Sequence, residues 1–386
     1  MSFSNFEKGM NRKNTMAIKW DLTEELFKHK DLNPMWIADS DYPTCKEVVR
    51  DLVKRAKHAA YGYSFPDASY KEAVKGWIKR HHYYDIDVES IVVTPGIVNA
   101  LFFIVKKFTK EGDNVVVSTP VYNPFYSVIE KNGRNIIRNK LIEEDDTYKI
   151  DFLDLEEKLS KAKMYILCNP HNPIGRVWTK EEVDMIYRLC KKYNCFLVSD
   201  EIHGDIVHDP YKLYSAGNYI NDYDKIIICT APSKTFNVAG LCDSNIIVNN
   251  KELRRELEEE LGNYSIEPNV FGLTACLSAY TKGDKWADDQ NKYIYENYLI
   301  TKDFFNKNIK EAKVYKLEGT YLMWVNLSFL GLSQNDLMEA LMNEHVLVGN
   351  GTVYDENYVG YIRLNLACGR KQLLEALESI KRVCKK

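Results

Sequence analysis

The sequence predicts an α/β protein in which a large, mostly parallel sheet lies between helices and a smaller α+β unit is attached to it. Short runs of β-branched residues alternate with longer helical segments up to residue 281, and continuous apolar strands separated by helices are typical of a parallel sheet buried on both faces. Beyond residue 281 the chain contains a long helical stretch, two strands and a final helix. We therefore expect a large domain over residues 46–281 and a small domain formed by residues 1–45 and 282–386.

Five strands of the large sheet are expected from runs rich in Val and Ile. They are SIVVTP (90–95), NVVVST (114–119), MYILC (164–168), CFLVSD (195–200) and KIIICTA (225–231). Helical segments lie between them, and the one over 179–193 opens with a Thr-x-x-Glu capping box, Thr179 to Glu182. Because open α/β sheets bind ligands at the carboxyl ends of their strands, functional residues should follow directly after these strands.

The small domain is expected from the patterns at the two ends of the chain. Periodicity predicts a helix over roughly 282–312, and strands are expected within TYLMWVNLSF (320–329) and GYIRLNLAC (360–368), before a last helix from residue 370. Residues 1–45 contain no obvious strand of the large sheet. We therefore assign that segment to the small domain.

Composition narrows the class of protein. The net charge is −3 over 386 residues with both signs mixed along the chain, so no electrostatic footprint for nucleic acid or an anionic membrane is present. No apolar run reaches the ~20 residues of a membrane span, and the N-terminus lacks the apolar core of a signal peptide. The nine cysteines form no CxxC pair, which favours free thiols in a reducing compartment. We expect a cytoplasmic protein without nucleic-acid or membrane partners.

The stretch VSDEIHGDIVHD (198–209) raises the question of a metal site, because two histidines lie among several carboxylates. His203 and His208 are five positions apart on a segment leaving the sheet, where they would not converge on one ion, and no HExxH helical pair occurs. We expect no metal. One of the acids must then serve another purpose.

The first three strand ends carry groups suited to a flat, anionic ligand. Gly96, followed by Ile97 and Val98, leads into a helix, where backbone N–H groups and the helix dipole favour an anion. Tyr122 follows the second strand and could stack on a ring. After the third strand, NPHNPIG contains two Asn-Pro steps that enforce a rigid turn and hold Asn172 above the sheet. Taken singly, a turn glycine or a locally packed loop tyrosine is an equally good interpretation.

The last two strands end in a carboxylate, Asp200, and near an amine, Lys234, which lies behind the hydroxyls of Thr230 and Ser233. A lone lysine is usually a surface residue, but this one completes a series of five useful strand ends. Pyridoxal 5′-phosphate uses every group in the series, because an amine binds its aldehyde and a carboxylate keeps its pyridine nitrogen protonated. The chain contains no Walker A motif and no GxGxxG fingerprint.

The chain resembles fold-type I pyridoxal-phosphate enzymes of the class I and II aminotransferase superfamily over nearly its whole length. The matching motifs are TPG (94–96), PVY (120–122), NPHNPIG (169–175), SDE (199–201) and APSK (231–234). The resemblance implies that the coenzyme is bound covalently by Lys234, with Asp200 at the pyridine nitrogen, Asn172 at the phenolate and Tyr122 stacked on the ring. It places the phosphate among Gly96, Ile97, Val98, Thr230 and Ser233.

The same resemblance implies how the substrate and a second subunit are engaged. Arg363, with Asn172, matches the pair at the substrate α-carboxylate, where a guanidinium fork binds both oxygens. Tyr61 matches a tyrosine that reaches the phosphate of the neighbouring site in a homodimer. Two positions depart from the usual pattern: His203 replaces a tyrosine beside the coenzyme, and Cys242 replaces a phosphate-binding arginine.

Four segments resemble a narrower group, the carbon–sulfur β-lyases similar to cystathionine β-lyase. They are MWIADSDYPT, HNPIGRVWT, SDEIH and APSKTFNVAGL, although Ser40-Asp41-Tyr42 stands where that group usually has Met-Asp-Phe. The resemblance implies cleavage of L-cystathionine or related cysteine S-conjugates to a thiol, pyruvate and ammonia. Two alternatives stay open: an aminotransferase, which would use the same catalytic residues, and a regulatory role through a protein partner.

Overall fold

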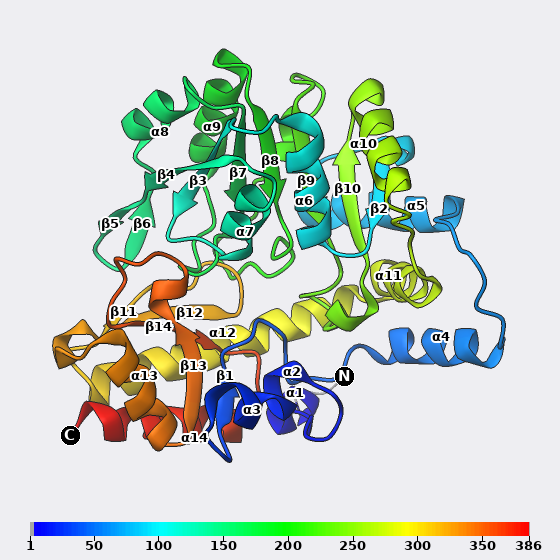
Figure 1. The fold of residues 1–386 in the computed structure, drawn as a ribbon. Helices are drawn as coiled ribbons and strands as arrows, with labels where there is room; N and C mark the ends of the chain where they lie inside the picture. The colour runs from blue at the N-terminus through cyan, green and yellow to red at the C-terminus, as the bar shows by residue number, and fades with distance from the viewer. Residues whose placement is uncertain (1–3, 386) are drawn as a thin grey trace.

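Seven strands form the large sheet of the computed structural model, which describes residues 4–385 (Figure 1). The strand order is β2-β10-β9-β8-β7-β3-β4. In chain order the strands are β2 (Ile91–Thr94), β3 (Asn114–Thr119), β4 (Asn135–Lys140), β7 (Met164–Cys168), β8 (Phe196–Asp200), β9 (Ile226–Thr230) and β10 (Ser244–Val248). Only β10 runs antiparallel to its neighbours among the described strands of this sheet. The mostly parallel sheet and its five predicted strands are confirmed, whereas β4 and β10 were not predicted from the sequence.

Helices cover both faces of this sheet, because successive side chains of β3 pack into two different apolar cores. Val115 and Val117 belong to one apolar core together with Leu101 of α6, whereas Val116 belongs to the other together with Val183 of α9. Alternate strand residues point to opposite faces, so an unbroken valine run requires cover on both. The helices of this part are α4 (Lys46–Lys57), α5 (Ala68–Trp77), α6 (Ile97–Phe108), α7 (Pro124–Glu130), α8 (Phe152–Leu159), α9 (Lys180–Lys192), α10 (Lys251–Asn263) and α11 (Val270–Lys282).

The second sheet combines strands from both ends of the chain. Its order is β1-β13-β14-β12-β11, and β1 pairs in parallel with β13. The strands are β1 (Asn33–Met35), β11 (Lys313–Val314), β12 (Leu322–Asn326), β13 (Val346–Asn350) and β14 (Tyr361–Asn365), and a separate hairpin is formed by β5 (Ile142–Glu144) and β6 (Thr147–Lys149). The N-terminal segment thus supplies an edge strand to a sheet whose other strands come some 280 or more residues later.

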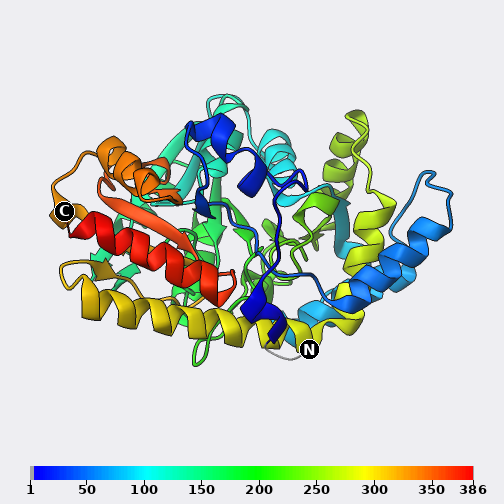
Figure 2. The ribbon, with the colours of Figure 1, turned by 90° about the horizontal axis from the view of Figure 1, so that it is seen from below.

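Three longer helices pack around this second sheet. They are α12 (Asp284–Asn308), α13 (Gln334–Asn343) and α14 (Arg370–Cys384), and the short helices α1 (Ser4–Lys8), α2 (Ile18–Asp21) and α3 (Thr23–Phe27) precede β1. Figure 2 shows α12 and α14 side by side, with α12 running on beneath the large sheet. The helix expected over 282–312 is therefore shorter, because α11 ends at Lys282 and a new helix starts after Gly283.

The two sheets meet where the parallel strands of the large sheet end. There the segment after β1 lies between them, because the backbone oxygen of Trp36 accepts a hydrogen bond from Arg363 of β14 and that of Ala38 accepts one from Lys234 beyond β9. Among residues 4–385 no helix combines the length and apolar character needed to cross a membrane.

Candidate active site

A cavity of about 180 Å³ lies at the carboxyl ends of β2, β3, β7, β8 and β9. Nine of the predicted site residues line it: Gly96, Ile97, Val98, Tyr122, Asn172, Asp200, His203, Ser233 and Lys234. Ala38, Asn99 and Cys168 also line it. Ala38 lies in the segment MWIADSDYPT, but the sequence analysis assigned a role to none of the three. Residues that are up to 201 positions apart, from Ala38 to Ala239, thus line one cavity.

Lys234 is held at the centre of this cavity. Its Nζ donates a hydrogen bond to the backbone oxygen of Ala38 at 2.7 Å. Burial lowers the pKa of the Lys234 ammonium to about 8, against the raising effect of Asp39, and Arg363 lowers it further. The neutral fraction of this amine near physiological pH is therefore much larger than that of an ordinary lysine, as a nucleophile or base requires.

Asp200 lies at the end of β8 in the same cavity. Its Oδ1 accepts a hydrogen bond from the backbone N–H of Ile202 at 3.1 Å. Burial raises the pKa of the Asp200 carboxyl to about 7, and the Ile202 N–H and the charge of Lys234 offset only part of that rise. A cationic group placed in the cavity would stabilise the charged carboxylate, so the site favours a ligand that carries a protonated ring nitrogen.

Arg363 is fixed with its guanidinium between the two sheets. Nη1 donates to Oδ1 of Asn172 at 3.0 Å and Nη2 donates to the Trp36 backbone oxygen at 2.6 Å. The group lies over the ring of Tyr354, 5.0 Å from its centroid. Gly349 is paired with Arg363 across the sheet, and a Cβ at position 349 would lie 3.1 Å from the arginine Cβ. The predicted pair of Arg363 and Asn172 is therefore in direct contact.

The start of α6 presents free amides to the cavity. Gly96 caps this helix with φ of +105°, a conformation that glycine adopts without strain. Its own N–H bonds to Thr94, and Ala100 is the first residue whose amide bonds back into the turn, to the Gly96 oxygen at 3.1 Å. The amides of Ile97, Val98 and Asn99 are the orphan donors that every helix start leaves, and they suit an anion.

Two of the residues predicted to bind the coenzyme lie outside the cavity. Thr230 is buried, with 2% of its surface exposed, but does not line the cavity. Tyr61 lies in the segment between α4 and α5, is 56% exposed, and donates its hydroxyl to the Ala56 oxygen at 2.5 Å. Neither residue is therefore among those that line this cavity.

The two positions that depart from the family pattern differ in their surroundings. His203 is buried in the cavity with its ring edge-on to Tyr321, and burial together with the charges of Lys234 and Arg363 lowers its pKa well below the usual value. His203 is therefore a neutral imidazole. Cys242 is exposed, so an anion in the cavity depends on backbone amides and hydroxyls.

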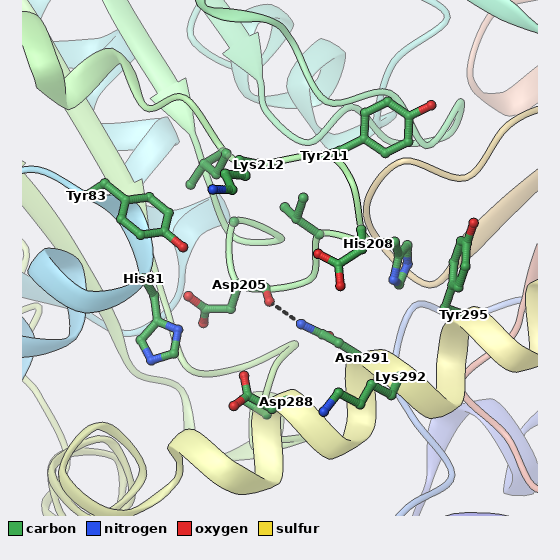
Figure 3. Close-up of a pocket in the computed structure, with 15 residues that line it drawn as sticks. His81, Tyr83, Asp205, His208, Tyr211, Lys212, Asp288, Asn291, Lys292 and Tyr295 are labelled. Atoms are coloured by element: carbon green, nitrogen blue, oxygen red, sulfur yellow. Dashed lines mark hydrogen bonds between the residues drawn. The ribbon is translucent and has the colours of Figure 1, made fainter.

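The two histidines of the stretch 198–209, His203 and His208, lie in different cavities. His203 lines the coenzyme cavity, whereas His208 lines a separate pocket of about 400 Å³, stacks on Tyr295 at 5.4 Å and bonds through Nε2 to the Thr320 oxygen (Figure 3). In residues 4–385 no group of three or more His, Cys, Asp or Glu side chains is arranged to hold a metal ion.

A buried charge network behind the cavity was missed by the sequence analysis. His82, at the end of a π-helical turn (Ile78–His82), lies with Nε2 2.9 Å from Oδ1 of Asp205 and Nδ1 3.5 Å from Oε2 of Glu201. Burial alone would lower the pKa of His82, but the two carboxylates raise it to about 9. Thr235 donates to Oδ2 of Asp205 at 2.7 Å.

This network adjoins both reactive residues through the chain. Glu201 is the neighbour of Asp200, and Thr235 is the neighbour of Lys234. Figure 3 shows Asp205 beside the pocket between the loop after β8 and α12, where its backbone oxygen accepts a hydrogen bond from Asn291 at 2.7 Å. No local motif marks His82, since its partners are more than 100 residues away.

A second, larger cavity of about 670 Å³ opens from the first. The two share Ala38, Tyr122 and Lys234, and the second also contains Arg363. A small ligand bound in the inner cavity would therefore face a second ligand held by Arg363, with the amine of Lys234 between them.

A family model for aminotransferases of class I and II matches residues 35–380. The chain belongs to this family. It is 40% identical over 382 residues to cystathionine beta-lyase PatB of Bacillus subtilis, a match that covers 98% of this chain and 99% of that protein.

Two solved structures resemble the whole chain. One is a putative aminotransferase of Clostridium difficile with bound pyridoxal phosphate, at 35% identity and a TM-score of 0.96, with 98% of this chain and 99% of that one covered. The other is cystalysin of Treponema denticola, which contains a pyridoxal 5′-phosphate cofactor, at 36% identity and a TM-score of 0.95, with 98% of each chain covered. The expected fold-type I architecture is confirmed.

Proposed function

We propose that the protein is a pyridoxal-phosphate-dependent carbon–sulfur β-lyase, which cleaves L-cystathionine or related cysteine S-conjugates to a thiol, pyruvate and ammonia. One observation carries the proposal: the amine of Lys234 stands where a cavity bearing Asp200 and a helix start meets a cavity bearing Arg363. The 40% identity to a cystathionine β-lyase over nearly the full length selects the lyase within the family.

The residues present fit the coenzyme. Lys234, with its pKa lowered to about 8, would bind the aldehyde, and Asp200 would hold the ring nitrogen. Asn172 and His203 would face the ring substituents and Tyr122 its face, while the amides after Gly96 and the hydroxyl of Ser233 would hold the phosphate. When bound, the coenzyme supplies an electron sink for negative charge at the substrate α-carbon.

The chain's own residues then perform two tasks. Arg363 binds the substrate α-carboxylate with its fork, which fixes the α-hydrogen toward the shared edge of the two cavities. The amine of Lys234 accepts the α-proton. The Cβ–S bond breaks with its electron pair leaving on sulfur, and one water is consumed overall, so that a cysteine thioether and water give a thiol, pyruvate and ammonia.

A test needs no oxo acid. We expect the purified holoenzyme to release thiol and pyruvate in equal amounts over many turnovers from S-propyl-L-cysteine or L-cystathionine. A single turnover that stalls until an oxo acid is added would instead support an aminotransferase. Lys234→Ala should abolish turnover; an effect on a regulatory partner that survives this substitution would have to come from another surface.

We further propose a cytoplasmic homodimer in which Tyr61 reaches the neighbouring subunit's site. Tyr61, Tyr63 and Phe65 follow α4 with 56%, 98% and 77% of their surfaces exposed, and contiguous exposed apolar groups of this kind usually mark an interaction site. The nine cysteines, all free, suit a reducing compartment. Sedimentation of the purified protein tests the dimer, and Tyr61→Phe should weaken coenzyme binding.

We also propose that residues 46–281 form the large domain and that residues 1–45 and 282–386 form the small domain.

A further inference from the structure

The larger of the two cavities is the place for the part of the substrate that leaves with sulfur. It extends from Lys234 and Arg363 outward between α13, β13, the end of α3 and the segment that follows β1, with a volume of about 670 Å³. The α-carbon of a bound amino acid must lie near Lys234, so the sulfur substituent of a cysteine thioether has to occupy the rest of this space. What lines the outer part therefore decides which thioethers fit, given the proposed lyase function.

One face of α13 forms a wall of this cavity. Asn335, Met338, Glu339 and Met342 line it, at the i, i+3, i+4, i+7 spacing of a single helix face. Two flexible thioether side chains thus lie in the middle and at the far end of the wall. Methionine packs adaptably against alkyl and aromatic groups.

Apolar side chains complete the outer cavity. Phe27 and Trp36 line it with their rings packed edge to face at 5.1 Å, and Val348 and Val353 line it from β13 and the turn that follows. Asn123 and Asn350 add uncharged amides. An alkyl or aryl substituent would exchange water for these surfaces and gain the free energy of apolar burial.

The charges are distributed unevenly along the cavity. Among the described residues that line it, the cations are Lys234 and Arg363, both at the inner end and both engaged in the reaction. The carboxylate of the outer part is Glu339, whose partner His29 lies 3.2 Å away. A substituent that carries its own carboxylate would therefore lose hydration without gaining a cation, and would approach a like charge.

We propose that the site selects cysteine thioethers whose sulfur carries an uncharged alkyl or aryl group, in preference to those whose leaving thiol carries a carboxylate as its only charged group, such as S-(2-carboxyethyl)-L-cysteine. The specificity-determining residues are Met338, Met342 and Val353, with Glu339 excluding anions. This inference rests on the proposed lyase function and narrows its substrate class.

The first test compares isosteric substrates with the holoenzyme. S-propyl-L-cysteine and S-(2-carboxyethyl)-L-cysteine differ only by a methyl group against a carboxylate at the end of the substituent. We expect kcat/KM for pyruvate release to be at least about tenfold higher for the propyl compound than for the carboxyethyl compound. Equal values, or a preference for the carboxyethyl compound, would overturn the inference.

A charge placed in the outer cavity gives a second test. Val353 lines the cavity and is 42% exposed, so Val353→Lys should fold and should reduce the preference for the propyl compound about tenfold by offering a cation. Val359 is similarly exposed, at 46%, and does not line the cavity, so Val359→Lys is the matched control and should leave the preference unchanged. The same change in both variants would refute the assignment of Val353.

Binding without turnover separates this inference from the lyase function. L-norleucine and L-2-aminoadipate lack a leaving group and again differ by a methyl group against a carboxylate, and calorimetry should show norleucine to bind at least about tenfold more tightly. If no thioether yields pyruvate, the proposed lyase function fails and the calorimetric comparison alone decides the inference. Tighter binding of aminoadipate would then overturn it.

Discussion

The buried histidine behind the active site offers the sharpest test of the electrostatic reasoning. His82 is fully buried between Asp205 and Glu201, and its pKa rises from 6.5 to about 9. At about 1.4 kcal/mol for each tenfold change in proton affinity, the folded protein binds this proton about 3 kcal/mol more tightly than the unfolded chain does. His82→Gln leaves two buried carboxylates without their cation, which costs about 3–5 kcal/mol in comparable buried pairs.

The pH dependence of this loss has a definite sign. Because the pKa of His82 in the folded state lies above that in the unfolded state, its contribution to the free energy of unfolding is complete below pH 6.5 and is lost as the pH rises through about 9. The difference in unfolding free energy between the natural protein and His82→Gln should therefore be large at pH 6 and shrink steadily toward pH 10.

Urea denaturation of the coenzyme-free protein, at one protein concentration and at several pH values, measures this difference. Glu201→Gln in the His82→Gln background should recover more than 1 kcal/mol, since one of the unpaired charges is removed. His58 is exposed, and His58→Gln should change stability by less than about 0.5 kcal/mol. If His82→Gln lowers the free energy of unfolding by the same amount from pH 6 to pH 10, His82 is not protonated in the folded protein and its contribution comes from packing alone.

Three further outcomes follow from the site geometry. We expect the rate of covalent pyridoxal phosphate binding to the coenzyme-free protein to rise with pH around a midpoint near pH 8, because the pKa of Lys234 is lowered to about 8. Absorbance and borohydride reduction measure this rate. A rate that still rises beyond pH 10 would contradict the lowered pKa. Arg363→Lys should reduce kcat/KM about 10- to 100-fold and leave the coenzyme spectrum unchanged, because a lysine cannot form the two hydrogen bonds by which Arg363 contacts Asn172 and the backbone. Unchanged kinetics would show that Arg363 does not bind the substrate. Gly96→Ala should lower the free energy of unfolding by about 1–3 kcal/mol and weaken coenzyme binding, because alanine is strained at the φ of +105° that Gly96 adopts. Gly262→Ala is the control and should not destabilise the protein, because a Cβ there meets nothing within 4 Å. Equal effects of the two substitutions in denaturation would show that position 96 does not strain an alanine.

The strand ends show where local pattern was sufficient. The runs 114–119 and 164–168 form strands with the predicted bounds, because short apolar runs rich in β-branched residues suit a strand that is buried on both faces of a sheet. By contrast, β10 begins with Ser244 and Asn245, which are polar and give little strand signal, and it is held by pairing on both sides with β2 and β9. Its pairing partners lie elsewhere in the chain, so the sequence of β10 alone could not reveal it.

The same distinction between local pattern and tertiary contact holds for the prediction of the site residues. Lys234, Asp200 and Asn172 each follow a strand that the chain's own pattern locates, so the sequence by itself determined that they gather at one sheet edge. The burial that lowers the pKa of Lys234, the contact between Arg363 and Asn172, and the ion pair of His82 with Glu201 were decided by the tertiary structure alone. Strand and helix propensity act between near neighbours, whereas desolvation and Coulomb interaction depend on distances that only the packed chain defines.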